Sequence, residues 1–513
     1  MDVDVVAKLL TTLPQDDDHP YRSGPWHPQS TEWRADDCDV IGEIPDDLDG
    51  VYIRNTENPV HPALAPYHPF DGDGMLHLVG FRDGQAFYRN RFVRTDGFVA
   101  EQEAGRALWA PLTAPRGSGE RQDGTGIRGY LKDASSTDVV VHNGVIKTSH
   151  FECGDLWRVD PFTLDTLGRS QWGSRFPADG VSAHPQLDES TGELLFFNYG
   201  LDAPHMHYGV LDPNDNLVHY IDVPLPGPRL PHDMTFTPNY AIVNDLPMIW
   251  DESLRTKGVF MPRFHREMPT RLGVIPRRGR TEDIRWFEFD PTYVLHWTNA
   301  WEDGDEIVVE GFFQHDPMPV VDKSAGFYER MSRYISLDGF QSRLHRWRMN
   351  LVTGKTREES LTDTISEFGM MNALSAGQQH RYTYAALGEP GRFLFNGLVK
   401  HDTATGKEDA LHFPAGVFGS ETAVAPKTGA VAGPGSAAEA AAEDDAYLVT
   451  LTIDEANDRS ECWVLDASRL SEGPIARIRL PERISSGTHA TWAPGTAIPG
   501  WQESDAWQAR AVL

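Results

Sequence analysis

The stretch Leu230-Pro231-His232-Asp233-Met234-Thr235-Phe236-Thr237-Pro238-Asn239-Tyr240-Ala241-Ile242-Val243-Asn244-Asp245 contains two short β-type runs. Met234–Phe236 and Tyr240–Val243 predict two strands joined by a Thr-Pro-Asn turn. His232 lies at the entrance of the first strand, after a Pro-rich connector. A histidine held there by β-structure suits a metal ligand or a general base. A single such histidine is more often a strand-end residue bonded to the backbone.

Similar β-type runs recur along the whole chain between Gly, Pro, Asp and Asn residues. They include Gly50–Arg54, Leu76–Phe81, Ala86–Val93, Val139–Lys147, Leu194–Asn198, Glu306–Gly311, Leu344–Asn350, Tyr447–Thr452 and Cys462–Asp466. Turns of the Asp-Pro or Asp-x-x-Thr-Gly type recur at Trp157–Leu164, Gln186–Glu193, Arg346–Gly354 and His401–Gly406. Strands at this spacing, joined by hairpin corners, predict an all-β fold with radial repetition, a β-propeller. A double β-sandwich is the structural alternative.

The predicted organisation is an N-terminal arm over residues 1–40 and a single propeller domain over 41–513. Helix signals are scarce, although Asp4–Leu13 fits a short amphipathic helical turn. Residues from about 100 to 129 and from about 248 to 268 interrupt the strand rhythm. We expect them to form loops or short helices that cap one face. Residues 428–446, rich in Gly, Ala and Ser and then acidic, predict a flexible loop.

Composition excludes several classes of protein. With 46 Lys and Arg against 76 Asp and Glu, the chain of 513 residues has a net charge of −30. Nucleic-acid binding, which needs a basic face, is therefore not expected. Cys38, Cys153 and Cys462 are too few and too far apart for a disulfide framework or a Cys-rich zinc site. The first thirty residues show no signal peptide, so we expect a cytoplasmic protein that makes at most weak contact with a membrane surface.

Three more histidines share the setting of His232. His184, His296 and His489 each lie at or near a strand terminus in an apolar and aromatic neighbourhood. The four positions are far apart in sequence, as expected if separate blades each contribute one ligand to a central axis. Together they predict a metal site more strongly than any one of them does.

The chain resembles the carotenoid oxygenase family, which includes carotenoid and stilbene cleavage dioxygenases and the retinal pigment epithelium isomerohydrolase. The resemblance runs from about Ile41 to Trp492. Its most specific motifs are Gly50–Pro59 (Gly-Val-Tyr-Ile-Arg-Asn-Thr-Glu-Asn-Pro) and Tyr67–His77 (Tyr-His-Pro-Phe-Asp-Gly-Asp-Gly-Met-Leu-His), followed by Tyr88–Thr95, Ala183–Pro185 and His296–Ala300.

This resemblance implies a seven-bladed β-propeller with a non-haem iron(II) on its axis. By position, the iron ligands are His184, His232, His296 and His489. The carboxylates that hold the ligand imidazoles are Glu152, Glu367 and Glu421. Neutral imidazole suits iron(II), and four such ligands leave two octahedral positions open. A carboxylate that accepts the far N–H of a ligand fixes its tautomer and raises its basicity. A single glutamate would otherwise be expected at the surface.

Other apparent motifs carry less weight. Gly124–Gly129 matches the dinucleotide fingerprint but lacks the strand and helix that should flank it. Asp71–Gly74 resembles the start of a calcium loop, but the twelve-residue pattern does not continue. His205 and His207 are more typical of a polar strand edge. His68, His77, His142 and His150 match no ligand position, and we expect them to be structural.

The predicted activity is oxidative cleavage of a carbon–carbon double bond by O2 into two carbonyl products, without an organic cofactor or external reductant. The expected partner is a lipophilic or aromatic alkene of the apocarotenoid type. Phe70, Phe151, Trp297 and Trp301 are candidate substrate contacts, with core packing as the alternative for each. An apolar patch from Leu246–Met248 and Val259–Met261 is a candidate membrane contact.

Two alternatives remain. One is cleavage of an aryl-alkene such as a stilbenoid or phenylpropene, and the other is a propeller that only binds an apolar ligand. The stilbene-cleaving branch typically holds a phenol with a lysine near the first of the glutamates and a tyrosine upstream. Here Phe151 precedes Glu152, and Ala104–Trp109 contains no tyrosine. The motifs also depart from the carotenoid-cleaving pattern, with Thr56-Glu57 in place of Gly-Pro and Gly369-Met370-Met371 in place of Pro-Arg-Ile.

Overall fold

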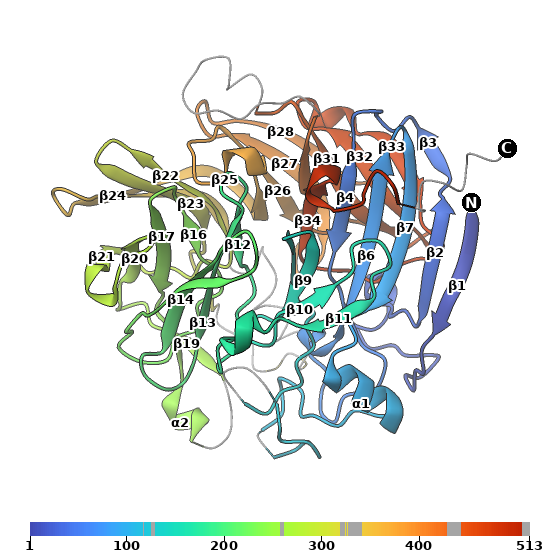
Figure 1. Ribbon diagram of the computed structural model, residues 1–513, viewed down its shortest axis with the longest axis horizontal. Coiled ribbons are helices and arrows are strands. Elements are labelled where there is room, and N and C mark those ends of the chain that lie inside the picture. The colour runs from blue at the N-terminus through green and yellow to red at the C-terminus, as the bar shows by residue number, and fades with distance from the viewer. Residues whose placement is uncertain are drawn as a thin grey trace. The chain divides into compact units, whose positions relative to one another are not determined.

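A computed structural model describes residues 1–115, 117–124, 129–256, 261–318, 324, 326, 341–427 and 443–504, and β-strands dominate it (Figure 1). The chain divides into two compact units. Unit 1 comprises Met1–Ala183, Pro414–Gly429 and Ala446–Leu513, and unit 2 comprises His184–Phe413 and Ala430–Asp445. Unit 1 is therefore built from both ends of the chain, and unit 2 from its middle.

The described residues of unit 1 form three antiparallel sheets. Its strands are β1 (Asp2–Lys8), β2 (Thr31–Asp37), β3 (Val40–Gly42), β4 (Gly50–Arg54), β5 (Glu57–Asn58), β6 (Asp73–Arg82), β7 (Gln85–Phe92), β8 (Asp138–His142), β9 (Val145–Ser149), β10 (Trp157–Val159), β11 (Thr166–Arg169), β29 (Val417–Phe418), β30 (Ala423–Pro426), β31 (Ala446–Asp454), β32 (Arg459–Asp466), β33 (Pro474–Arg479) and β34 (Ala490–Pro494). The strand orders are β1-β2-β7-β6-β4-β34 with β5 on β6, β11-β10-β9-β8, and β29-β31-β32-β33-β3 with β30 on β31.

The two ends of the chain meet in two of these sheets. The C-terminal strand β34 pairs with β4, so that Trp492 lies opposite Tyr52. The N-terminal strand β3 pairs with β33 and extends the C-terminal sheet, as Figure 1 shows where blue β3 lies beside β33. Each pairing joins strands more than 400 residues apart, and this places His489, the residue before β34, against the N-terminal motif.

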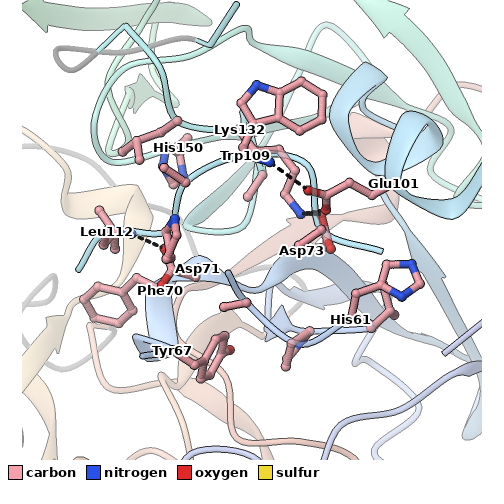
Figure 2. A pocket seen from close by; sticks show the side chains of 18 residues that line it. His61, Tyr67, Phe70, Asp71, Asp73, Glu101, Trp109, Leu112, Lys132 and His150 are labelled. Carbon is pink, nitrogen blue, oxygen red and sulfur yellow. Dashed lines mark hydrogen bonds and ion pairs between the residues drawn. The ribbon is translucent and has the colours of Figure 1, made fainter. Parts of the chain in front are cut away.

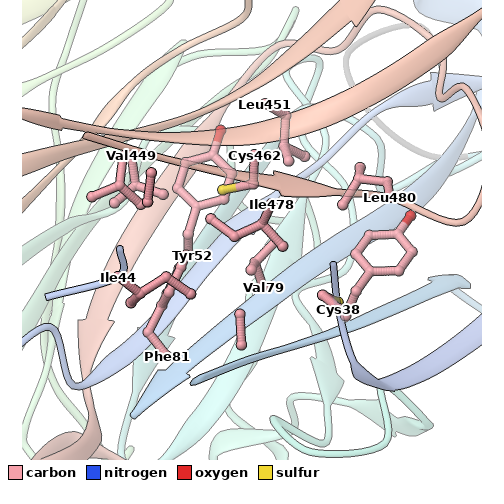
Figure 3. Close-up of a cluster of buried hydrophobic side chains, with 14 of the residues drawn as sticks. Cys38, Ile44, Tyr52, Val79, Phe81, Val449, Leu451, Cys462, Ile478 and Leu480 are labelled. Carbon is pink, nitrogen blue, oxygen red and sulfur yellow. The ribbon is translucent and has the colours of Figure 1, made fainter. Parts of the chain in front are cut away.

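A large core cluster of unit 1 is built from side chains of these two sheets. Figure 3 shows Tyr52 packed among Val449, Cys462 and Ile478, side chains that come from β4, β31, β32 and β33. All four side chains are essentially inaccessible to solvent. The Tyr52 hydroxyl donates a hydrogen bond to the backbone oxygen of Glu421, at 2.9 Å. Because a buried hydroxyl needs a partner, this bond fixes the segment that carries Glu421 to the core.

Unit 2 repeats one antiparallel plan. Its strands are β12 (Gln186–Asp188), β13 (Glu193–Tyr199), β14 (Met206–Leu211), β15 (Leu217–Asp222), β16 (Thr235–Phe236), β17 (Tyr240–Asp245), β18 (Met248–Trp250), β19 (Pro262–Phe264), β20 (Thr270–Pro276), β21 (Arg285–Phe289), β22 (Trp297–Asp303), β23 (Glu306–Phe313), β24 (Arg343–Asn350), β25 (Thr356–Met370), β26 (Tyr382–Gly388), β27 (Phe395–Asp402) and β28 (Lys407–His412). They form β12-β13-β14-β15, β16-β17-β20-β21, a β18-β19 ribbon and a sheet from β22 to β28.

The long strand β25 belongs to two four-stranded ladders. Its first part pairs with β24, with Thr356 opposite Met349, and its last part pairs with β26, with Glu367 opposite Ala386. The described part of unit 2 thus holds four four-stranded ladders and unit 1 holds three sheets. Seven is the number of blades that the family resemblance implies.

Helices are short in both units. The α-helices are α1 (Asp96–Ala104) and α2 (Glu252–Arg255), and the 3-10 helices are η1 (Gly24–Trp26), η2 (Pro69–Asp71), η3 (Trp172–Ser174), η4 (Thr281–Asp283), η5 (Ala373–Ser375), η6 (Leu470–Glu472) and η7 (Gly495–Ala497). Thr95 caps α1 by accepting from the Phe98 N–H, and Gly105 ends it in the left-handed conformation. Within the described part of the chain, no helix has the length and apolar character needed to span a bilayer.

The predicted corners form as their sequences indicate. Asp160 accepts hydrogen bonds from the N–H groups of Phe162 and Thr163, and Asn350 accepts from Val352 and Thr353 in the same way. These side chains replace the backbone acceptor of the turn, which explains why Asp or Asn stands at each corner.

Two sequence predictions about strands and helices were wrong. Val139–Lys147 is not one strand but the hairpin β8-β9, because Asn143 and Gly144 both take positive φ and form a tight turn. Asp4–Leu13 is not helical: residues 2–8 form β1, where alternating valines favour pairing with β2.

The regions expected to be loops show more order. The N-terminal arm over residues 1–40 contributes β1 and β2 to the sheet of β7. The region 100–129 includes the end of α1, and 248–268 holds α2 together with the β18-β19 ribbon. Residues 428–442 of the expected flexible loop lie outside the described residues, as does most of Gly124–Gly129.

The expected apolar patch is not exposed as a whole. Leu246 and Met248 are buried in the core of unit 2 beside Leu272 and Phe287, so they cannot supply an exposed surface. Met261 is exposed, and residues 257–260, which include Val259, lie outside the described part of the chain.

Candidate metal centre

His184, His232 and His296 converge within unit 2. Their ring centroids are 4.8 Å apart for His184 and His232, and 5.1 Å apart for each of the other two pairs. The Nε2 atoms of His184 and His232 lie 3.2 Å apart, and the candidate ligand nitrogens of all three lie within 4.8 Å of one another. Adjacent ligands about 2.1 Å from an octahedral metal are roughly 3 Å apart, so this geometry fits a metal ion.

The backbone at His184 is unusual. This residue precedes β12 and has a φ of +61°, a left-handed conformation that few non-glycine residues adopt. Phe368, next to Glu367, also has a positive φ, of +56°. Such conformations cost on the order of 1–3 kcal/mol and tend to cluster at functional sites.

Glu367 orients His296. Its Oε2 accepts from His296 Nδ1 at 2.7 Å and from the Phe368 N–H at 2.6 Å, and its side chain is fully buried. Because an ionised carboxylate can only accept, Nδ1 carries the imidazole proton and Nε2 keeps its lone pair. The ring of Phe368 lies 4.7 Å from that of His296 and packs against it. An imidazole with its proton on Nδ1 is the tautomer required of a residue that binds a metal through Nε2.

Asp233 connects the chain segments that carry the three histidines. Its Oδ1 accepts from Gln186 Nε2 at 3.0 Å and from the Met234 N–H at 2.6 Å, while Oδ2 accepts from the Trp297 N–H at 2.8 Å. Gln186 follows His184 by two residues, and Trp297 directly follows His296. In the sequence, the position of Asp233 directly after His232 is the only signal for this role.

His489 and Glu421 form a similar pair within unit 1. Glu421 Oε2 lies 3.3 Å from His489 Nδ1 and accepts from the Ala490 N–H at 2.6 Å. Burial lowers the pKa of His489, but the charge and hydrogen bond of Glu421 outweigh it and raise that pKa to about 9. The Asn55 N–H donates to the His489 carbonyl at 2.9 Å, an extension of the β34-β4 pairing. Glu421 thus favours the proton on Nδ1, as Glu367 does for His296.

Glu152 is buried in unit 1, in a tightly held loop. Cys153 takes a positive φ of 63°, and Gly154 exchanges two backbone hydrogen bonds with Val181, of 3.0 and 2.9 Å. The loop of Glu152 is therefore fastened to the segment that leads directly into His184.

Glu57 is a buried carboxylate that stands out in the sequence only as a departure from the family pattern. Thr488 donates its hydroxyl to Glu57 Oε1 at 3.1 Å, and burial raises the pKa of Glu57 to about 7. Thr488 precedes His489, so Glu57 holds the segment on which the histidine stands. The motif position itself was the signal, but a glutamate in a sequence is usually exposed.

The four aromatic candidates fall into two groups. In unit 1, Phe70 and Phe151 meet edge to face, with centroids 5.8 Å apart, and both are partly accessible. In unit 2, Trp297 packs against Trp347 at 5.2 Å, and Trp301 packs against His380 at 5.5 Å. Trp297 and Trp301 are almost fully buried, which is the core packing considered as the alternative.

Comparison with known proteins shows which family the chain resembles. The family profile described as "Retinal pigment epithelial membrane protein" matches residues 26–494. The carotenoid cleavage oxygenase of Mycobacterium tuberculosis is 30% identical over 95% of this chain and 100% of its own length. The isoeugenol monooxygenase of Pseudomonas putida is 29% identical over 93% of this chain and 98% of its own.

Solved structures with a similar fold support the same family. The crystal structure of Pseudomonas brassicacearum lignostilbene dioxygenase has a TM-score of 0.77 and 26% identity, over 93% of this chain and 99% of that one. This confirms the predicted propeller fold. A match over most of the chain, with both the fold and the order of the motifs preserved, shows that this protein is an enzyme of the carotenoid oxygenase family, of the carotenoid-cleavage dioxygenase type.

Proposed function

We propose that this protein is an iron(II)-dependent dioxygenase that cleaves a carbon–carbon double bond of an apolar, apocarotenoid-type alkene into two carbonyl products. The observation that carries the proposal is the convergence of His184, His232 and His296, whose ligand nitrogens lie within 4.8 Å. Family membership supports it, because relatives named for carotenoid, isoeugenol and lignostilbene substrates share the oxidative cleavage of alkenes.

The proposed iron ligands are these three histidines and His489. His184, His232 and His296 lie close together within unit 2, and His489 is proposed as the fourth ligand by its motif position and its Glu421 partner. All-nitrogen, neutral ligands fit iron(II) and leave two octahedral positions for O2 and substrate or water. When bound, iron(II) supplies the O2-binding and redox chemistry that amino-acid side chains lack.

In this proposal, the protein's own side chains orient the histidine ligands and exclude water. Glu367 and Glu421 keep a proton on Nδ1 of their histidines, and we propose that Glu152 does the same for a third ligand. The histidines do no acid–base work in this scheme. Phe70 and Phe151 supply apolar edges that keep water away from the double bond. Both oxygen atoms end in the products, so the alkene supplies all the electrons and no reductant is needed.

Cleavage of an aryl-alkene is the second candidate. Relatives with near-complete coverage are named isoeugenol monooxygenase and lignostilbene dioxygenase, and they support it as well as the carotenoid relatives support the first. Phe151 in place of a lysine argues against the usual phenol anchor of the stilbene-cleaving branch. We also propose a cytoplasmic location, which fits three buried cysteines that form no disulfide within the described part of the chain.

The test is turnover by anaerobically iron-loaded protein. Apocarotenals, hydroxystilbenes and propenylphenols are supplied with ¹⁸O2, and O2 uptake and product masses are recorded. We expect one class to yield two carbonyl compounds per O2, each labelled with one ¹⁸O before exchange with water. Absence of O2 uptake with every alkene would refute the proposed function and favour a binding protein.

A further inference from the structure

Glu57 stands where the family motif usually has proline, and its side chain is buried against the segment that carries His489. Its Oε1 lies 3.1 Å from the Thr488 hydroxyl, and within the part of the chain that the structure describes its Oε2 has no hydrogen-bond partner. Only 2% of Glu57 is exposed, and a buried carboxyl oxygen without a partner is costly. An apolar side chain would avoid this cost, so stability of the fold does not account for a glutamate here.

The hydroxyl of Thr488 lies between two oxygen atoms. It is 3.1 Å from Glu57 Oε1 and 3.3 Å from the Thr137 backbone oxygen, and Thr488 itself is only 3% exposed. Because Thr137 remains as an acceptor, the buried hydroxyl would keep a partner if residue 57 were apolar. The bond to Glu57 is therefore not needed to satisfy Thr488. What it adds is a second, opposing contact that fixes where Thr488 lies, one residue before His489.

The N-terminal motif holds the backbone on both sides of Thr488. After it, the His489 backbone oxygen accepts from the Asn55 N–H at 2.9 Å. Before it, Gly487 fits so closely that a Cβ there would lie 2.7 Å from Arg54 Nε. The segment that carries the histidine is thus packed directly against the motif. A change in one of these contacts is passed to the position of His489 because no gap separates the two segments.

The strand that carries Glu57 is itself firmly held. In β5, Glu57 pairs with Gly74 of β6. The residue before Gly74 is Asp73, whose Oδ1 lies 2.8 Å from Lys132 Nζ. Lys132 Nζ also lies 2.6 Å from Glu101 Oε2 of α1, as the sticks around a cavity of unit 1 show in Figure 2. Glu57 therefore stands on an anchored element, as a residue that positions another must.

We infer that Glu57 is a positioning residue for His489 and acts through the Thr488 hydroxyl. The inference rests on the proposed function, because it takes His489 to be an iron ligand. Glu421 fixes the proton on the imidazole of His489, whereas Glu57 fixes where the backbone of that residue lies. The glutamate is kept at a cost to stability, as is common for residues that serve a site. Removing its bond to Thr488 should lower metal affinity without lowering the stability of the metal-free protein.

The experiment compares two substitutions of Glu57 in the full-length protein. Glu57→Met removes the bond and keeps an unbranched side chain, and Glu57→Gln keeps a group that can bond to the Thr488 hydroxyl. Iron(II) affinity is measured without O2 by competition with a chelator, and urea unfolding is measured on the metal-free protein. We expect Glu57→Met to bind iron(II) about tenfold more weakly, the lower end of the range for groups behind metal ligands, with no loss of stability. Glu57→Gln should stay within about twofold of wild type.

Thr488→Val tests the same bond from its other end. It should weaken iron(II) binding at least as much as Glu57→Met does. The double variant should lose no more than Thr488→Val alone, because both substitutions remove one shared bond. The matched control is Thr452→Val in β31, where another buried hydroxyl donates to the Glu461 backbone oxygen at 3.2 Å in a bond that involves no proposed ligand. That variant should keep the iron(II) affinity of wild type.

Three results would overturn the inference. The first is an unchanged iron(II) affinity in Glu57→Met. The second is an equal loss in Glu57→Gln, or additive losses in the double variant, since either means that Glu57 does not act through Thr488. The third is a Glu57→Met protein that is unfolded or destabilised, which would show a structural role only.

His489→Ala separates failure of this inference from failure of the proposed function. A large loss of iron(II) affinity in His489→Ala, with none in Glu57→Met, refutes the inference alone. Full iron(II) affinity in His489→Ala instead refutes the ligand set of the proposed function, on which the inference rests.

Discussion

Replacing Glu367 by glutamine tests how the carboxylates behind the histidines control the site. Glu367 is fully buried, and Oε2 accepts from His296 Nδ1 at 2.7 Å and from the Phe368 N–H at 2.6 Å. Glutamine keeps the shape but loses the charge, and its single carbonyl oxygen replaces a charged acceptor of two short bonds. The hydrogen bond from His296 Nδ1 changes from charge-assisted to neutral, a loss of roughly 1–2 kcal/mol.

The expected result is a loss of about 10–100-fold in metal affinity or turnover, the range seen when groups behind metal ligands are removed. Iron content is measured after dialysis against a graded series of chelator concentrations, and turnover is measured at saturating iron. Circular dichroism and thermal unfolding check that the fold persists. We expect the affinity to fall while the β-structure stays intact.

The chain offers a matched control. Glu310 is also fully buried and also lies beside a histidine, with Oε2 3.2 Å from His380 Nε2. Neither residue belongs to the proposed metal site. Glu310→Gln removes the same charge from a buried position beside a histidine, and it also breaks the ion pair of Glu310 with Arg346, so it should lower stability without changing iron affinity. An unchanged iron affinity in Glu367→Gln, or an equal loss in both variants, would refute the reasoning.

Three further predictions follow from the contacts described. His296→Ala should abolish iron binding and turnover but leave a folded β-protein, and activity with full iron content would exclude His296 as a ligand. Asp233→Asn should weaken iron binding by on the order of tenfold, because one of the bonds from Gln186, Met234 or Trp297 loses its acceptor; chelator titration measures it, and unchanged affinity would contradict it. Burial, with the charge of Asp155, raises the pKa of Asp133 from 3.8 to about 6. The folded state then holds the proton more tightly, so wild type should lose on the order of 3 kcal/mol of stability as the pH rises from about 4 through 6. Asp133→Asn should lose this contribution and show a shallower slope in urea unfolding, and identical slopes would contradict the assignment.

Much of the fold could be predicted from the sequence because the signals for a strand lie within a few neighbouring residues. Gly50–Arg54 is β4 residue for residue, and the Asp and Asn corners form as their spacing indicates. These features depend on side-chain alternation and on turn chemistry within a few residues. The error at Val139–Lys147 had the same origin, since the Asn143-Gly144 turn signal lay inside an apolar run.

Contacts between segments far apart in the sequence could not be predicted from local patterns. The pairing of β34 with β4 depends on strands more than 400 residues apart, and no local pattern specifies it. The role of Asp233 depends on where Gln186 and Trp297 lie in space. The division of β25 between two ladders depends on the neighbouring strands on each side. The family motifs indicated the histidines and glutamates, but not the groups that hold them.

The central claim is that His184, His232, His296 and His489 hold one iron(II) ion. Anomalous diffraction at the iron edge, from crystals of anaerobically prepared protein, tests it most directly. The account predicts one iron peak per chain, about 2.1–2.2 Å from the Nε2 atoms of all four imidazoles. A peak bonded elsewhere, or one of the four rings well outside bonding distance, would contradict it.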